Sequence, residues 1–185
     1  MGASPDFTDL LRGAKAGDSD CYARLFGLVY EELRAAAHRI GAGRAQTLQP
    51  TALVHEAWIR LASNLDPVQD RLHFIAVAST AMRQVLANYA RAARSEKRGG
   101  ASRSVTLDTD LVPSTEPWSD VCELDECLEE LKGLHPRHAR VVELRVFGGL
   151  TILETAEAIG LSHGTVESDW VMARAWLMRR LAPGT

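Results

Sequence analysis

Histidine is the first side chain to consider for chemistry, because its imidazole ligates metals and transfers protons near neutral pH, and this chain has six. His55 stands beside Glu56, and His135 and His138 lie three positions apart. A helical metal hydrolase needs a second histidine four residues from the first, and none follows His55 at that spacing. His135 precedes Pro136 at a helix start. We therefore expect no metal, no cofactor and no catalytic residue, with a metal enzyme as the alternative that a metal analysis would test.

Charge is distributed unevenly along the chain, although the formal net charge of its 185 residues is only -3. Residues 83–103 contain six Arg or Lys and one acid, whereas residues 104–131 contain nine acids and no base. Basic residues on a helix can follow a phosphate backbone. Dense acids can repel nucleic acid or lie on a basic surface of a partner, and solvation of both blocks is the alternative.

Composition and segment types set the broad class. With 46% hydrophobic residues the chain is an ordinary globular protein. It has no apolar run near the roughly 18 residues of a membrane span, and its first residues lack the pattern of a signal peptide, so we expect a cytoplasmic protein without membrane contact. Three scattered cysteines, Cys21, Cys122 and Cys127, are too few for a disulfide framework and are interpreted as buried small hydrophobes.

The elements that position these residues are predicted to be helices. Ala, Leu, Glu and Arg recur at spacings of three and four, and strand signals are nearly absent. The sequence predicts an all-α fold of two small helical domains (residues 1–95 and 119–185) joined by an acidic, flexible linker (96–118). The helices are expected at 6–16, 19–40, 51–63, 69–95, 119–132, 136–147, 151–159 and 162–181. Asp18 or Ser19 is predicted to cap the second of these helices and Thr51 the third, and Gly133 is predicted to end the fifth.

The last two predicted helices form a compact motif. Thr151 and Glu154 have the spacing of a capping box, Gly160 permits a left-handed turn, and Ser162 can cap the next helix. A buried stripe follows at positions 166, 170, 173 and 177. This pattern predicts a helix-turn-helix, as in DNA-binding proteins. An αα-hairpin without a ligand is the alternative.

Residues 134–177, LHPRHARVVELRVFGGLTILETAEAIGLSHGTVESDWVMARAWL, resemble the promoter-binding C-terminal domain of RNA polymerase sigma factors of the extracytoplasmic-function (ECF) type. The segments TLQPTALVHEAWIRLA (47–62) and HFIAVASTAMRQVLANYARAARSEKR (73–98) are similar to the polymerase-binding and promoter-melting helices of that family. The resemblance implies a sigma factor whose partners are core RNA polymerase and promoter DNA, with an anti-sigma factor as a further partner it allows. A helix-turn-helix regulator that does not bind polymerase is the alternative.

The resemblance and the usual docking of a recognition helix imply three sets of site residues. Recognition of the minus-thirty-five region falls to the helix residues Ser162, His163, Gly164, Thr165, Glu167, Ser168 and Arg174. The single strand of the minus-ten region falls to Arg83, Gln84, Asn88, Tyr89, Arg91 and Arg94. Polymerase binding falls to Leu53, His55, Glu56, Trp58 and Arg60.

The chain departs from the family pattern at a few of these positions. Ala52 and His55 stand where many members carry Asp and Gln. Glu167 and Asp169 stand in the recognition helix where basic residues are common. Glu167 can accept a hydrogen bond from the amino group of cytosine, so we expect a distinct promoter sequence.

Overall fold

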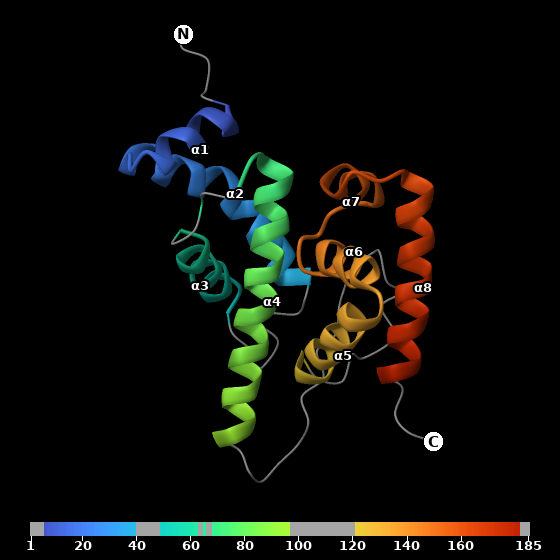
Figure 1. Cartoon of the computed structure of the whole chain (residues 1–185). Helices are drawn as coiled ribbons and strands as arrows, with labels where there is room; N and C mark the ends of the chain where they lie inside the picture. Colours follow the sequence, from blue (N-terminus) through green and yellow to red (C-terminus); the bar gives the residue numbers. More distant parts are fainter. Residues whose placement is uncertain (1–5, 40–48, 63–64, 66–67, 97–120, 182–185) are drawn as a thin grey trace.

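The structure is a computed structural model, and it describes residues 6–39, 49–62, 65, 68–96 and 121–181. The described residues form eight α-helices and no strand (Figure 1), which confirms the predicted all-α class. In chain order these helices are α1 (Phe7–Lys15), α2 (Ser19–Arg39), α3 (Pro50–Ala62), α4 (Arg71–Glu96), α5 (Val121–Leu134), α6 (Pro136–Val146), α7 (Ile152–Ile159) and α8 (His163–Leu181).

Helices α1 to α4 share one apolar core. Leu25, Val29 and Leu33 follow one another at four-residue spacing on α2, so that they lie on one face, and all three are almost completely buried. Phe74 and Met82 of α4 are fully buried in the same cluster. Burial of one such side chain contributes about 1.5–3 kcal/mol relative to exposure, so this spacing alone fixes which face of each helix turns inward.

Helices α5 to α8 repeat this principle in the second half of the chain. Leu131 of α5, Leu144 of α6 and Leu177 of α8 are each buried, and Ala173 lets α8 approach its neighbours closely. Helix α8 therefore packs along α5 and α6, while α7 covers the end of this group (Figure 1).

The observed helix ends lie within two residues of the predicted ones, with two local errors. Asp18 caps α2 as predicted, because its carboxylate accepts two backbone NH bonds at 2.8 and 3.1 Å. Thr51 is not the cap of α3, since that helix begins at Pro50, whose fixed φ suits a first turn. Gly133 does not end α5, which continues to Leu134.

The two halves of the chain are packed against each other through α4, which contacts α5, α6 and α7 (Figure 1). The turn after α6 approaches α4 closely at Gly148, where a Cβ atom would lie 2.5 Å from the Ser79 hydroxyl. The apolar cluster is continuous across this contact. Apart from residue 96, the linker predicted at 96–118 lies outside the described residues, and the domain division stays a prediction.

No disulfide joins Cys21, Cys122 and Cys127. Cys122 is buried as predicted, whereas Cys21 and Cys127 are partly exposed. Burial raises the pKa of the Cys127 thiol, which keeps it protonated and unreactive near neutral pH.

Candidate nucleic-acid interface

Helices α7 and α8 form the predicted helix-turn-helix. The Thr151 hydroxyl accepts a bond from the Glu154 backbone NH at 3.2 Å, and the Glu154 carboxylate accepts one from the Thr151 NH at 2.8 Å, which completes the capping box. Gly160 has the left-handed φ of 67° that ends α7. The NH of Leu161 donates back to the carbonyl of Ala156 at 2.9 Å, so the turn is closed by backbone bonds.

The recognition helix α8 is fixed at its start. The Ser162 hydroxyl accepts a bond from the Thr165 NH at 3.2 Å, as expected of the cap. One turn later Val166 is fully buried against Val141 and Ala156, where α8 crosses α7 and α6. The small side chain of Ala156 permits this crossing. On the other side of the first turns of α8, His163 and Gly164 are exposed.

Asp169 lies on the inner side of the recognition helix and is 4% exposed. Its two carboxylate oxygens accept bonds from Nε and Nη2 of Arg137 at 2.5 and 2.9 Å, and Nε2 of His138 lies 3.3 Å away. The bonds from Arg137 lower the pKa of this carboxyl. Asp169 therefore joins α8 to α6, and its side chain lies on the buried side of α8.

The outer side of α8 carries the predicted base-reading residues. Glu167 and Ser168 are exposed, and the imidazole of His163 lies 3.8 Å from the Glu167 carboxylate. Val171 and Met172 continue this face one turn later and are 60% and 62% exposed. Sequence reasoning missed these two apolar residues, although their i+4 spacing from Glu167 and Ser168 is the signal that places them on the same face.

The arginines of the second half differ in exposure. Arg145 is buried, donates to the carbonyl of Leu150 at 3.2 Å and lies 4.8 Å from the centre of the Trp170 ring. Arg174 is half-buried, and its Nε has no hydrogen-bond partner within the described part of the chain. Arg179 is exposed near the end of α8. The predicted contact of Arg174 with DNA would therefore come from the half-buried side of the helix.

On α4, the uncharged members of the predicted single-strand set are accessible. Gln84 and Asn88 lie one turn apart and are exposed, and Tyr89 is 43% exposed beside them. An exposed aromatic ring next to two amides offers a stacking surface and base-edge hydrogen bonds. The side chain of Arg94 lies outside the described residues.

The two described arginines of this set have other partners. Arg83 is 6% exposed and donates from Nη1 to Asp125 at 2.6 Å, from Nη2 to Glu129 at 2.5 Å and from Nε to Glu143 at 3.0 Å. Arg91 is half-exposed and donates to Asp125 at 2.9 Å. In this arrangement carboxylates of α5 and α6 accept hydrogen bonds from Arg83, so its contact with the single strand stays a prediction.

The predicted polymerase-binding helix α3 divides into buried and exposed residues. Leu53 and Trp58 are 0% and 6% exposed and belong to the core, where the Trp58 ring lies 4.6 Å from that of Phe26. The prediction that these two side chains meet polymerase is corrected, because they are turned inward and hold the helix in place. Glu56 and Arg60 are exposed.

Two further features of α3 complete its outer side. His55 is exposed, and its ring lies 5.5 Å from Phe26 and 6.4 Å from Tyr30 of α2. Ile59 is 67% exposed one turn after His55 and was missed by sequence reasoning. The outer side of α3 therefore combines an exposed apolar residue with charged ones, as protein contacts commonly do.

Comparison with known proteins decides the family. The family model described as ECF sigma factor matches residues 4–183. The chain belongs to the ECF sigma factor family. The ECF RNA polymerase sigma factor SigK of Mycobacterium ulcerans (strain Agy99) is 29% identical over 178 residues, which are 90% of this chain and 89% of SigK. The solved structure of CnrH in complex with the cytosolic domain of CnrY covers 95% of this chain and 97% of its own, at 22% identity and a TM-score of 0.47.

This sigma factor accordingly binds core RNA polymerase and directs transcription from specific promoters, so its partners are the polymerase and promoter DNA. A helix-turn-helix regulator that ignores polymerase is not favoured, because the family match also includes the N-terminal half. No described helix of the sigma factor is long and apolar enough to cross a membrane.

The histidines of the sigma factor do not gather into a metal site. Within the described ranges, no three His, Cys, Asp or Glu side chains are arranged to hold a metal ion. The rings of His135 and His138 lie 4.9 Å apart, but the neighbouring carboxylate of Asp169 is already held by Arg137. His138 thus supports the recognition helix.

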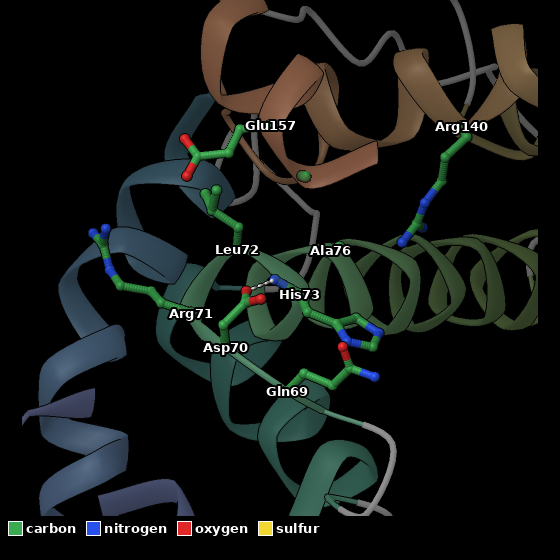
Figure 2. Close-up of a pocket in the computed structure, with 9 residues that line it drawn as sticks. Gln69, Asp70, Arg71, Leu72, His73, Ala76, Arg140 and Glu157 are labelled. Carbon is green, nitrogen blue, oxygen red and sulfur yellow. Dashed lines mark hydrogen bonds between the residues drawn. The ribbon is translucent and has the colours of Figure 1, made fainter. Parts of the chain in front are cut away.

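A cleft of 540 Å³ lies between the start of α4 and the second half of the sigma factor. Figure 2 shows Arg140 of α6 and Glu157 of α7 on one side and Asp70, Arg71 and His73 on the other. The Asp70 carboxylate accepts the backbone NH of His73 at 2.8 Å, so it serves as the cap of α4. The cleft is lined by both halves and depends on their contact.

Proposed function

We propose that the outer side of α8 reads the upstream, minus-thirty-five element of the promoter. Its N-terminal turns carry the base-facing residues His163, Gly164, Thr165, Glu167 and Ser168, with Ser162 as the cap and Arg174 toward a phosphate. The observation that carries this proposal is the orientation of α8. Asp169 anchors one side of the helix to α6, and this leaves Glu167 on the side that a major groove would receive.

Val171 and Met172 extend the proposed reading surface with apolar contacts. Thymine presents a methyl group in the major groove, and apolar side chains contact it. Glu167 accepts a bond from the amino group of cytosine. The side chains together favour an upstream element with cytosine near the start of the recognition helix and thymine one helical turn further along it.

The N-terminal half supplies the other two proposed contacts. Gln84, Asn88 and Tyr89 of α4, with Arg83, Arg91 and Arg94 on the same helix, bind the unpaired strand of the minus-ten region. The exposed residues of α3 bind core polymerase, and these are His55, Glu56, Ile59 and Arg60.

The wider role follows from the family and the sequence. The sigma factor acts without catalysis of its own, works in the cytoplasm where polymerase and DNA are found, and has an anti-sigma factor as a further partner. Its two domains, 1–95 and 119–185, bind the two promoter elements across the linker 96–118. Two binding units on one chain suit a fixed separation between promoter elements.

The test is transcription by core polymerase with the full chain on promoters whose upstream element is randomised, at two salt concentrations. Glu167→Gln should change the preferred base at one position by roughly 1–3 kcal/mol. Arg174→Ala should weaken all sequences about equally and lower the salt slope by about one unit. An unchanged base preference for Glu167→Gln would remove that residue from the reading surface.

A further inference from the structure

The contact between α4 and the second half of the chain includes a network of six charged side chains, which we call the interface network. It consists of Arg83, Arg91, Arg140, Asp125, Glu129 and Glu143. The three positive and three negative charges balance. Thr80 of α4 joins the network, because its hydroxyl lies 3.0 Å from the Glu143 carboxylate and 3.1 Å from Nη1 of Arg140.

Arg83 is held most completely. All three of its guanidinium nitrogens donate to carboxylates, two of them on α5 and one on α6. Burial opposes the charge on Arg83, but the hydrogen bond to Glu129 and the negative charges of Glu143 and Asp125 outweigh it and raise its pKa. The arginine is therefore charged in the closed arrangement, and each of its three nitrogens already faces a carboxylate.

Phosphate oxygens bind a guanidinium group through the same geometry as carboxylate oxygens. The donors that Arg83 and Arg91 would offer to the sugar–phosphate backbone of a promoter strand are the donors that now face Asp125 and its neighbours. The network and a DNA strand therefore compete for the same arginines, whereas Gln84 and Asn88 stay exposed in either case.

We propose that the carboxylates of α5 and α6 take the place of DNA phosphates on α4, so that the free sigma factor is held closed and its halves must separate before α4 receives the promoter strand. This inference rests on the proposed role of α4 in binding the single strand. It assigns a function to the acidic helix α5, whose charges complement the basic helix of the same chain.

Solvent can reach the charged part of this contact. A cavity of 230 Å³ lies beside Arg83 and Glu143, and the cleft of 540 Å³ lies at the start of α4, so water reaches the contact from two sides. The side chains of Arg91 and Glu129 are 50% and 53% exposed. The contact therefore has two parts, the apolar cluster that continues across it and this partly hydrated charged network, and the charged network is the part that a competing anion would displace.

The direct test removes two charges from α5 in the full-length chain. Asp125→Asn with Glu129→Gln leaves three arginines facing one carboxylate, while Glu126→Gln with Glu130→Gln removes as many charges from α5 outside the network. The measurements are the radius of gyration by X-ray scattering and binding of a short, mixed-sequence single-stranded DNA by fluorescence anisotropy. Arg83→Ala is then added to the first double variant.

We expect the first double variant to be more extended than the wild type and to bind the DNA about tenfold more tightly, within the usual range of coupling between two sites. The matched control should keep the compact radius and change affinity by less than about twofold, since the Glu130–Arg180 ion pair that it breaks joins α5 to α8 and leaves the interface network intact. Addition of Arg83→Ala should abolish the gain, because the released arginine is its source.

A steric variant tests the same contact without any change of charge. Ser79 is buried on α4 and faces the turn at Gly148, so Ser79→Leu should force the halves apart and extend the molecule. Hydrogen exchange of the wild type adds a measurement that needs no variant. Peptides covering 76–87 and 141–150 should lose protection when the chain enters a promoter complex with polymerase.

The proposal is overturned if both variants stay as compact as the wild type, or if the two peptides remain equally protected in the promoter complex. A double variant that fails to fold leaves the steric variant and the exchange experiment to decide. Failure of the proposed single-strand role of α4 would be seen separately, as a double variant that is extended but gains no affinity for the DNA, and scattering would still report the closed contact of the wild type.

Discussion

Asp169→Asn separates support of the recognition helix from the reading of DNA. Asparagine keeps the shape of the side chain but removes the charge that Arg137 contacts through two nitrogens. Hydrogen bonds to charged groups contribute about 1.5–3 kcal/mol. The Arg137 side chain is 56% exposed, and water screens and re-solvates it, so the value must be reduced. We expect a loss of about 1–2 kcal/mol in the free energy of unfolding, which lowers Tm by about 2–8 °C.

Glu167→Gln is the matched control, because it makes the same chemical change two positions away on the same helix. The Glu167 side chain is 63% exposed and has only the His163 imidazole nearby, at 3.8 Å. Its substitution should leave the free energy of unfolding within about 0.5 kcal/mol of the wild type. On a randomised upstream element, Glu167→Gln should change the preferred base, whereas Asp169→Asn should weaken binding without changing the preference.

The pH dependence follows from the direction of the pKa shift. The bonds from Arg137 lower the pKa of Asp169 in the folded chain. The carboxylate therefore contributes its full stability above the unfolded pKa of about 3.9, and this contribution is lost as the pH falls through the lower folded value. Thermal melts followed by circular dichroism should show the deficit of Asp169→Asn unchanged between about pH 7 and pH 5 and shrinking below about pH 4. The orientation of α8 would be refuted if Asp169→Asn had the same Tm as the wild type at neutral pH while Glu167→Gln had a lower one.

Further predictions concern the turn, the cap and the polymerase surface. Gly160→Ala should lower the free energy of unfolding by about 1–2 kcal/mol, because position 160 has a left-handed φ and no neighbouring atom that an added Cβ would meet. Gly164→Ala, at an ordinary helical position, should not lower it. Urea unfolding of both variants compares them. Thr151→Ala should cost about 1 kcal/mol in the same assay through loss of the capping box. Ile59→Ala should weaken binding of core polymerase with little change in Tm, whereas Trp58→Ala should cost about 3–5 kcal/mol of stability; pull-down and melting on both variants distinguish surface from core.

The local features of the fold were predictable because they depend on residues close in sequence. The capping box joins Thr151 to Glu154 and the turn needs a left-handed residue at position 160, and both requirements are visible in a short window of sequence. Helical periodicity also predicted that Val166 and Leu177 are buried. Such signals fix the element and its inner face, and the structure confirms them.

The contacts that the sequence did not reveal join residues far apart in the chain. Asp169 and Glu167 are both acidic and lie two positions apart, so helical periodicity places them on different sides of α8. Periodicity does not say which of the two carboxylates Arg137 contacts. The polymerase-binding set failed in a similar way, because a family motif names Leu53 and Trp58 without separating inward from outward side chains.

The opposed charge blocks show the same limit at the scale of the whole chain. Sequence alone reveals a basic segment at 83–103 and an acidic one at 104–131, and it allows the acids to lie on any basic partner. The structure places Asp125 and Glu129 of the acidic block on Arg83 of the basic block, across 42 and 46 positions. The basic partner of these acids is thus a residue of the same chain. Under the proposed competition, a ligand of Arg83 must replace these carboxylates, and we expect a promoter strand presented by core polymerase, with many phosphates at once, to do so more readily than free DNA.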